Sequence, residues 1–244
     1  VQYPANDPTA AWMTTHYDFH DIHDNVLKFD ILGHVDPTAI RMLQRIGTVK
    51  PLDIPMNDPE TLSLFYCDDA LHADPRIYKK ENGALGLPEF GTRITRRVLE
   101  ETKPSSFSEL VMISGLTHGT DVWAGNAQSL VQAGHPLSEV IACRDDIMTY
   151  LLDKKLKPLD AFKIMESVRK GKGLTAEWEE DMKAHNVPDW YIDSCKKIKY
   201  MFPKAHAVAY VMMAVRIAWY KVHEPQNFYI QFFTHRCDEY EIDT

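Results

Sequence analysis

Residues typical of helix starts recur along the chain from residue 36 onward, and short apolar-periodic segments follow them. Asp36-Pro37 and Asp58-Pro59 each place an N-cap residue before a proline at the first helical position. Ser106-Phe107-Ser108-Glu109 has the pattern of a capping box. Further helices are predicted to begin at Pro158, Pro188 and Pro203, and to end near Ser167, Met201 and His223.

The first 36 residues have a different character. They mix aromatic, His and Asp residues and then continue into Val26 to Leu32, a run with the length and composition of a strand that Gly33 ends. The sequence therefore predicts a mainly α protein, with a multi-helix domain over 37–244 and a small β piece within 1–36. We expect Asp68 to Leu87 to form a surface loop with at most a short helical turn.

Composition excludes several classes of protein. The 244 residues are 45% hydrophobic and 25% charged, with a net charge of -8, which is typical of a globular protein and argues against a whole-surface nucleic-acid binder. Four widely spaced cysteines without a C-x-x-C pair argue against a disulfide framework. The most apolar stretch, Ala205 to Tyr220, is short for a membrane span and contains Arg216. We expect a cytoplasmic protein without a membrane partner.

Two features near the N-terminus could bind a metal. His16, His20 and His23 alternate with aspartates, although a solvated polar loop is the simpler interpretation of this cluster. Alternation along the predicted strand places Lys28 and Asp30 on one face. A carboxylate held on a strand suits Mg²⁺ and a neighbouring lysine suits phosphate, but an internal ion pair would explain the same pattern.

Two further segments could bind phosphate. Pro203 fixes a helix start, so Lys204 and His206 lie in a first turn whose free N–H groups favour anions. Ser114 to Asp121 is rich in Gly and hydroxyl residues and is predicted to be a turn between two helices, either a phosphate cradle or a simple corner. The lysines of 196–204 are interleaved with aromatics, a pattern that suits a phosphate backbone with a stacked base but is also common on a solvated helix face.

Several long segments resemble one family in the same order along the chain. The sequence resembles the PolC-type replicative DNA polymerases of Gram-positive bacteria, the C-family polymerase III alpha subunits. The matching segments are 17–20, 27–34, 86–93, 113–123, 162–173 and 196–210.

The resemblance implies roles for particular residues. The strand with Lys28 and Asp30 corresponds to the palm, so residues 1–36 would be the C-terminal piece of the palm and 37–244 the fingers. Asp30 would be the catalytic and metal-binding carboxylate, the third of three, with Lys28 beside it facing the nucleotide. The implied nucleotide-binding residues of the fingers are Ser114, Gly115, His118, Arg144, Phe202, Lys204 and His206.

One departure from the family limits what this chain can do. The family's other two palm aspartates belong to a P-D-[IF]-D-like motif upstream, and this motif does not occur here. The resemblance implies Mg²⁺ shared with carboxylates outside this chain, because a two-metal mechanism needs several carboxylates. We therefore expect a piece of a larger polymerase that is inactive alone, with deoxynucleoside triphosphates, template-primer DNA, the rest of the palm and other replisome subunits as partners.

Two other functions stay open on the residues alone. A stand-alone module could bind nucleotides or single-stranded nucleic acid through the lysines of 196–204 without chemistry. A metal-dependent hydrolase could use the cluster between His16 and Asp30.

Overall fold

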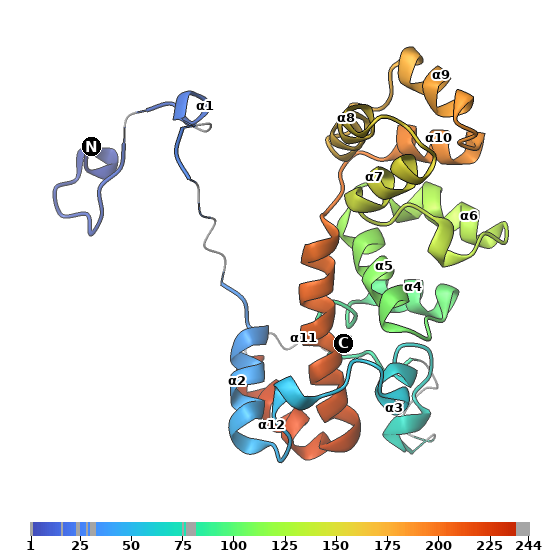
Figure 1. The fold of residues 1–244 in the computed structure, drawn as a ribbon. Helices are drawn as coiled ribbons and strands as arrows, with labels where there is room; N and C mark the ends of the chain where they lie inside the picture. The colour runs from blue at the N-terminus through green and yellow to red at the C-terminus, as the bar shows by residue number, and fades with distance from the viewer. Residues whose placement is uncertain are drawn as a thin grey trace. The chain divides into compact units, whose positions relative to one another are not determined.

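The computed structural model describes residues 2–15, 17–22, 25–27, 29, 33–74, 76 and 82–237. The chain divides into two units, residues 1–34 and 35–244, which are described separately. The second unit is mainly α-helical, as the sequence predicts, and is shown with its element labels in Figure 1.

The described part of the second unit consists of helices joined by short connections. Its α-helices are α2 (Asp36–Ile46), α3 (Pro59–Ser63), α4 (Arg93–Thr102), α5 (Phe107–His118), α6 (Gln128–Gln132), α7 (Arg144–Asp153), α8 (Pro158–Arg169), α9 (Ala176–Ala184), α10 (Asp189–Lys197), α11 (Lys204–His223) and α12 (Pro225–His235). Short helical turns are η2 (Pro51–Asp53), η3 (Asp69–Leu71), η4 (Trp123–Ala127) and η5 (Leu137–Glu139).

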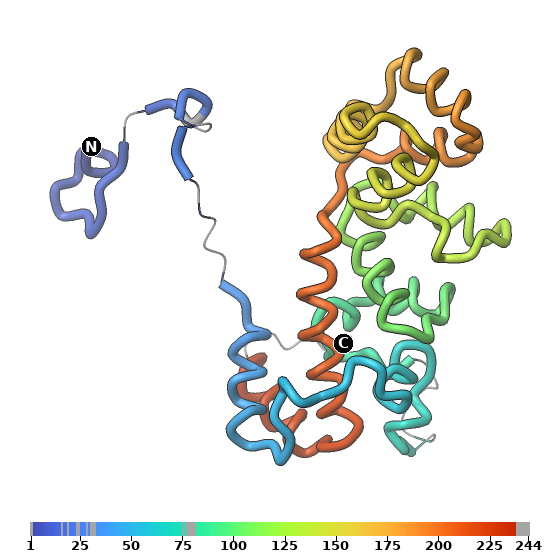
Figure 2. The backbone as a smooth tube through the Cα atoms, viewed as in Figure 1, coloured from blue at the N-terminus to red at the C-terminus, as the bar shows by residue number. Residues whose placement is uncertain are grey.

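Helix α11 is the element around which this unit is organised. Its 20 residues pack against α2, α3, α5, α7 and α12. The backbone trace shows α2 and α12 near one end of α11 and α8 to α10 near the other (Figure 2). Helix α11 is buried on several sides because apolar residues occur around most of its circumference.

The predicted helix starts are largely confirmed. The Asp58 side chain accepts a hydrogen bond from the Thr61 N–H at 2.9 Å, and Ser106 and Glu109 form the predicted capping box of α5. Asp36 is an exception, because the helix already includes it and Val35 takes the N-cap position without a side-chain cap. The Asp36 carboxylate instead lies 3.5 Å from the Arg236 guanidinium.

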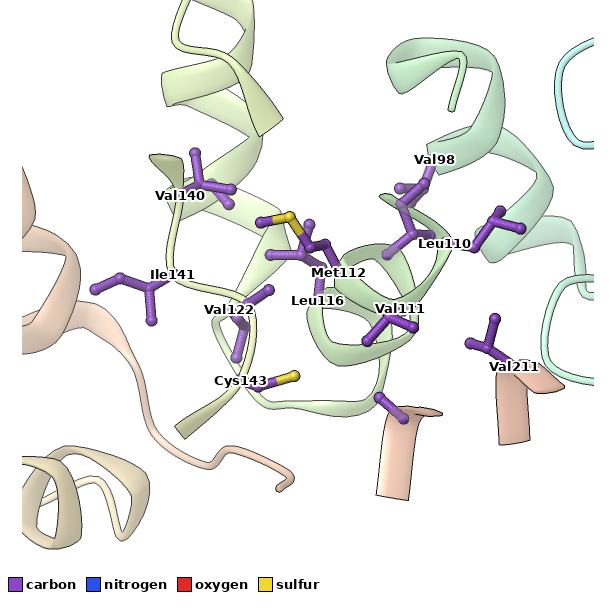
Figure 3. Close-up of a cluster of buried hydrophobic side chains, with 14 of the residues drawn as sticks. Val98, Leu110, Val111, Met112, Leu116, Val122, Val140, Ile141, Cys143 and Val211 are labelled. Carbon is purple, nitrogen blue, oxygen red and sulfur yellow. The ribbon is translucent and has the colours of Figure 1, made fainter. Parts of the chain in front are cut away.

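The core of the second unit is continuous from α2 to α12. Part of it is shown in Figure 3, where side chains of α5 meet Val140, Ile141 and Cys143 of the segment before α7. Gly115 permits this contact, because a Cβ added there would lie 2.5 Å from Cys143 Sγ and 2.7 Å from the Ala142 carbonyl oxygen. The glycine therefore serves close packing between α5 and this segment.

The segment predicted as a surface loop over 68–87 is only partly at the surface. Its first half contains the expected short turn, η3, but Asn82, Gly83 and Ala84 are buried. Lys221 of α11 explains the difference, because its Nζ donates to the carbonyl oxygens of Gly83 and Leu85, both at 2.7 Å. Lys221 is only 3% exposed. The prediction of a surface loop was therefore wrong for residues 82–84.

The first unit contains the turn η1 (Pro4–Asn6) and the short helix α1 (Phe19–Ile22). Gln2 and Thr14 form an isolated antiparallel bridge. Val26, Leu27 and Phe29 are not in a strand, and the described residues of the whole chain contain only isolated bridges and no strand. Lys28 and Asp30 to Leu32, the other part of the predicted strand, lie outside the described residues.

Candidate functional site

The segment predicted as a turn over 114–121 is helical in its first half. Helix α5 continues through His118, so Ser114 and Gly115 lie within the helix and are buried, with their backbone groups in a helical segment. The prediction of a turn was wrong for residues 114–118, because Gly and hydroxyl residues favour turns only where packing does not decide, whereas residues 119–121 do lie outside the helix. Here the close contact between Gly115 and Ala142 stabilises the helix in place.

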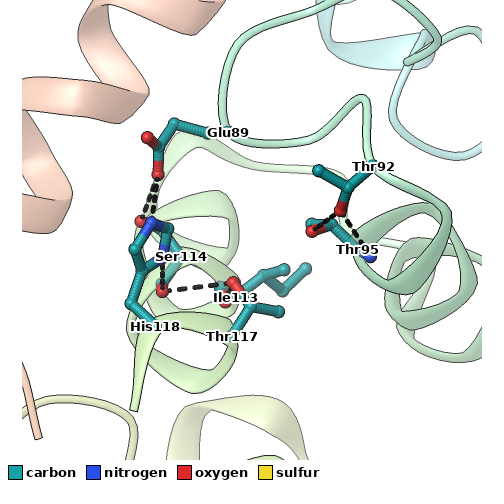
Figure 4. A network of polar contacts seen from close by, with 7 residues as sticks. All are labelled: Glu89, Thr92, Thr95, Ile113, Ser114, Thr117 and His118. Carbon is teal, nitrogen blue, oxygen red and sulfur yellow. Dashed lines mark hydrogen bonds and ion pairs between the residues drawn. The ribbon is translucent and has the colours of Figure 1, made fainter. Parts of the chain in front are cut away.

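A carboxylate from a distant loop completes the end of α5. Glu89 Oε2 lies 3.0 Å from His118 Nε2 and accepts from Ser114 Oγ at 3.3 Å (Figure 4). The other ring nitrogen of His118, Nδ1, lies 2.7 Å from the Ser114 carbonyl oxygen. The hydrogen bond that His118 donates to Glu89 is the largest cause that raises the pKa of His118 above its usual value. His118 is thus held on both sides.

The backbone of Glu89 is strained. Its φ of 65° lies in the left-handed region, which non-glycine residues occupy rarely. The side chain of Glu89 is only 10% exposed and that of His118 is 30% exposed. A strained and buried carboxylate persists only where the surrounding structure fixes it.

Aromatic rings from the start of α11 lie against His118. The ring centroids of His118 and Phe202 are 5.7 Å apart, and those of His118 and His206 are 6.0 Å apart. Phe202 and His206 lie 5.0 Å apart, and Tyr210 follows at 4.4 Å from His206. The structure therefore brings the candidate residues of α5 and α11 into one group, which we call the ring cluster: His118, Phe202, His206 and Tyr210.

A third segment, the start of α7, joins the ring cluster. The Arg144 N–H donates to the Phe202 carbonyl oxygen at 3.2 Å. Lys204 Nζ lies 2.8 Å from Asp146 Oδ1, and this hydrogen bond is the largest cause that raises the pKa of Lys204. The Lys204 N–H donates to Asp145 Oδ2 at 2.6 Å. The first turn of α11 is therefore already in contact with a carboxylate, so an incoming phosphate would compete with Asp145.

Two separate basic segments lie next to each other beside the ring cluster. The Met201 N–H donates to the Arg169 carbonyl oxygen at 3.3 Å, and a Cβ added at Gly171 would lie 2.5 Å from the Lys199 carbonyl oxygen. Tyr200, which is 46% exposed, lies 5.3 Å from Phe202 by ring centroids. We call this surface the basic ridge; its exposed cationic side chains are Lys170, Lys172, Lys197 and Lys199.

The predicted metal site cannot be built from the described residues. Asp30 and Lys28 lie outside them, as do His16 and His23 of the histidine cluster. Among the residues that the structure describes, no group of three or more His, Cys, Asp or Glu side chains is arranged to hold a metal ion.

Two cavities in the structure lie away from the ring cluster. One of about 400 Å³ is lined by residues of α8 and α9, and one of about 450 Å³ is lined by residues between Pro59 and His72. Neither is lined by a candidate nucleotide-binding residue. The helices within the described parts of the chain include none with the length and apolar character that crossing a membrane requires.

Sequence reasoning did not single out Glu89. It is 25 residues from Ser114 along the chain, and only the fold shows that the two residues meet. The available signal was its position within 86–93, one of the segments that resemble the polymerase family.

The family model of the bacterial DNA polymerase III alpha subunit finger domain matches residues 36–187, which is more than half of the chain. The chain belongs to this finger-domain family. It is similar to the DNA polymerase III PolC-type of Bacillus subtilis (strain 168), with 61% identity over 245 aligned positions that cover 100% of this chain and 17% of that protein.

Other relatives give the same result. The PolC-type polymerases of Bacillus cereus (61% identical) and Staphylococcus aureus strain MW2 (59% identical) are each matched over 100% of this chain. The chain spans 17% of the length of each of these relatives. The resemblance to PolC-type polymerases is confirmed, and the finger domain described here is a small part of proteins of that length.

Proposed function

We propose that this chain forms the nucleotide-binding fingers of a bacterial replicative DNA polymerase, with the edge of the palm in residues 1–36. The polymerase adds deoxynucleotides to a primer under the direction of a template. The observation that carries the proposal is the ring cluster: candidate residues from α5 and α11 meet at the start of α7, in a chain of the finger-domain family.

The proposed binding mode divides the nucleotide between two parts of this surface. The rings of Phe202 and His206 offer a face on which a base can stack. Lys204 and Arg144 supply positive charge for the triphosphate. Ser114 and Gly115 are buried, so their contribution is indirect, through the position of His118.

The basic ridge supports the part of the proposal that concerns DNA. Exposed lysines from two segments lie side by side, and the exposed ring of Tyr200 lies between them and Phe202. Lysines on such a ridge neutralise phosphates of template-primer DNA, and Tyr200 can stack on an unpaired template base. A stand-alone nucleic-acid module would use the same surface, and membership of the finger-domain family supports the polymerase function over that alternative.

Catalysis requires groups outside this chain. Asp30 is the proposed catalytic carboxylate and metal ligand, and Lys28 lies two residues before it in the sequence. When bound, Mg²⁺ supplies charge neutralisation to the triphosphate and lowers the pKa of the primer hydroxyl. The fingers contribute positioning and electrostatic stabilisation, which are the main terms in phosphoryl transfer. We expect no primer extension by this chain alone; the rest of the palm and the other replisome subunits complete the enzyme.

The test uses the intact polymerase that contains this segment. Lys204→Ala should weaken the binding of all four deoxynucleotides about tenfold or more, because a charge-assisted hydrogen bond is worth roughly 1.5–3 kcal/mol. Asp145→Asn should strengthen it, because the change removes a competing negative charge and keeps an oxygen that accepts the Lys204 N–H. Lys163→Ala, at an exposed position within α8, is the matched control and should change nothing.

The measurement is the apparent Kd for nucleotide in single-turnover incorporation. Equal affinities in Lys204→Ala, Lys163→Ala and the wild type would contradict the pocket. Removal of Lys197 and Lys199 together should lower the affinity for template-primer DNA and reduce its salt dependence, with unchanged nucleotide affinity.

A further inference from the structure

The hydrogen bonds of His118 favour its protonated form. Nδ1 faces the Ser114 carbonyl oxygen and Nε2 faces Glu89 Oε2, and both partners are acceptors. A neutral imidazole has one donor nitrogen and one acceptor nitrogen, so one of these contacts would place two lone pairs against each other. Only the imidazolium form donates from both nitrogens. A proton shared with Glu89 stays on the histidine, because an imidazole is the stronger base.

The same contacts determine what His118 can offer to a nucleotide. Both N–H groups are used within the protein, so the ring does not donate a hydrogen bond to a ligand without breaking a contact. Its positive charge and its ring edge face Phe202 and His206. The ring is thus a fixed cation at the edge of the ring cluster.

We propose that Glu89 is a positioning residue of the nucleotide pocket, and that its carboxylate holds His118 as a cation against Phe202 and His206. The inference rests on the proposed function for its ligand, a deoxynucleoside triphosphate. The strained backbone of Glu89 and its near-complete burial fit this role, since both cost free energy that the contacts to His118 and Ser114 offset.

The proposal gives a pH dependence with a defined sign. The titratable groups in contact with His118 are Glu89 from the 82–92 loop and His206 from α11; Tyr210 follows on the far side of His206. Glu89 raises the pKa of His118, so the cation persists above the usual titration range of histidine. When the pH rises through that pKa, Nε2 loses its proton and faces a carboxylate, and nucleotide binding weakens.

Glu89→Gln separates charge from shape. The glutamine amide can donate to Nε2 while Nδ1–H still donates to Ser114, so a neutral His118 is fully satisfied. Glu89→Gly is the second variant, because glycine adopts a φ of 65° without strain and the change removes only the side chain. Glu139→Gln is the control: Glu139 lies 3.6 Å from His135, and its side chain is 55% exposed.

The first measurement is the NMR titration of the His118 ring in this chain, with the signal assigned by His118→Gln. In the wild type the midpoint should lie above the usual value of about 6.5, and in Glu89→Gln and Glu89→Gly it should fall, because the acceptor that raises the pKa of His118 is removed. Glu139→Gln should leave it unchanged. An unchanged midpoint in both Glu89 variants would overturn the proposal.

The second measurement is the pH profile of KM for nucleotide in the intact polymerase. At pH 7.5, KM should be about three- to tenfold higher in Glu89→Gln than in Glu139→Gln, with kcat changed less than about twofold, because only a partly screened charge is lost. Coinciding profiles would overturn the positioning role even if the NMR midpoint falls. If Lys204→Ala is without effect as well, the proposed nucleotide pocket fails; if Lys204→Ala weakens binding, only the role of Glu89 fails.

Discussion

The contact between α5 and the segment before α7 leaves no room for a methyl group at Gly115. A Cβ there would lie 2.5 Å from Cys143 Sγ, 2.7 Å from the Ala142 carbonyl oxygen and 3.0 Å from the Ala142 carbonyl carbon. Normal contacts between heavy atoms are about 3.5 Å or longer, so the segments must separate by about 1 Å. Two of the three atoms belong to the backbone, which cannot rotate away.

The magnitude follows from two opposing effects of Gly115→Ala. Alanine favours the helix over glycine by about 1 kcal/mol. Overpacking of a closely packed core costs roughly 1–3 kcal/mol, and a contact with backbone belongs at the upper end of that range. We therefore expect the free energy of unfolding to fall by about 2 kcal/mol and Tm to fall by about 4–8 °C.

The assay is urea and thermal unfolding followed by circular dichroism. The double variant Gly115→Ala/Cys143→Ala removes the nearest atom, so we expect it to recover about 1 kcal/mol relative to the sum of the single variants. Gly115→Ala with the same or greater stability than the wild type would refute the packing argument. Gly115→Ala should weaken nucleotide binding only to the extent that it lowers the fraction of folded protein.

Three further changes test other contacts of the second unit. Ser106→Ala removes the capping box of α5 and should lower the free energy of unfolding by about 1 kcal/mol, as measured by urea titration. The control Ser129→Ala, at an exposed position in α6, should leave the free energy of unfolding unchanged. The hydrogen bond from Arg169 is the main cause that lowers the pKa of Glu166 to about 2. The stabilisation from the ionised Glu166 is therefore present above pH 4.5 and is lost as the pH falls toward 2. Glu166→Gln should remove this part of the pH dependence of the free energy of unfolding, and an unchanged slope in acid would contradict the prediction. Burial lowers the pKa of Lys221 to about 8, so the folded state loses this proton at a lower pH than the unfolded state does. The free energy of unfolding of the wild type should therefore rise between pH 8 and 10.5 relative to that of Lys221→Met. Parallel curves of unfolding free energy against pH would show that burial does not govern the pKa of this lysine.

Local signals predicted the helices well because their causes are local. The capping box at Ser106 and the start of α11 after Pro203 depend on residues within one turn of the helix end, so the sequence shows them directly. Asp58 caps α3 for the same reason. The resemblance to PolC-type polymerases then indicated which helices carry the candidate site.

Long-range contacts explain what the sequence did not reveal. The Ser114 to Asp121 segment has the composition of a turn, but residues 114–118 are helical, and Gly115 packs against Ala142. Residues 82–84 belong to a segment predicted as a surface loop, yet Lys221 donates to the Gly83 carbonyl oxygen from 138 residues away. Glu89 meets His118 only in the folded chain. Propensity and spacing contain no information on such contacts.

The central position of α11 has a consequence for synthesis on the ribosome. Helices α2, α3, α5 and α7 are made before α11, the helix on which they pack, and only α12 follows α11 among the described helices. Tyr220 donates to the Val49 carbonyl oxygen across 171 positions, so this pairing forms only when almost all of the second unit has left the exit tunnel. Until then the apolar faces of the earlier helices lack their partner, and such intermediates are prone to aggregate. The speed at which the last helices are translated, and the chaperones present at that moment, therefore determine how much of the nascent domain reaches its folded state.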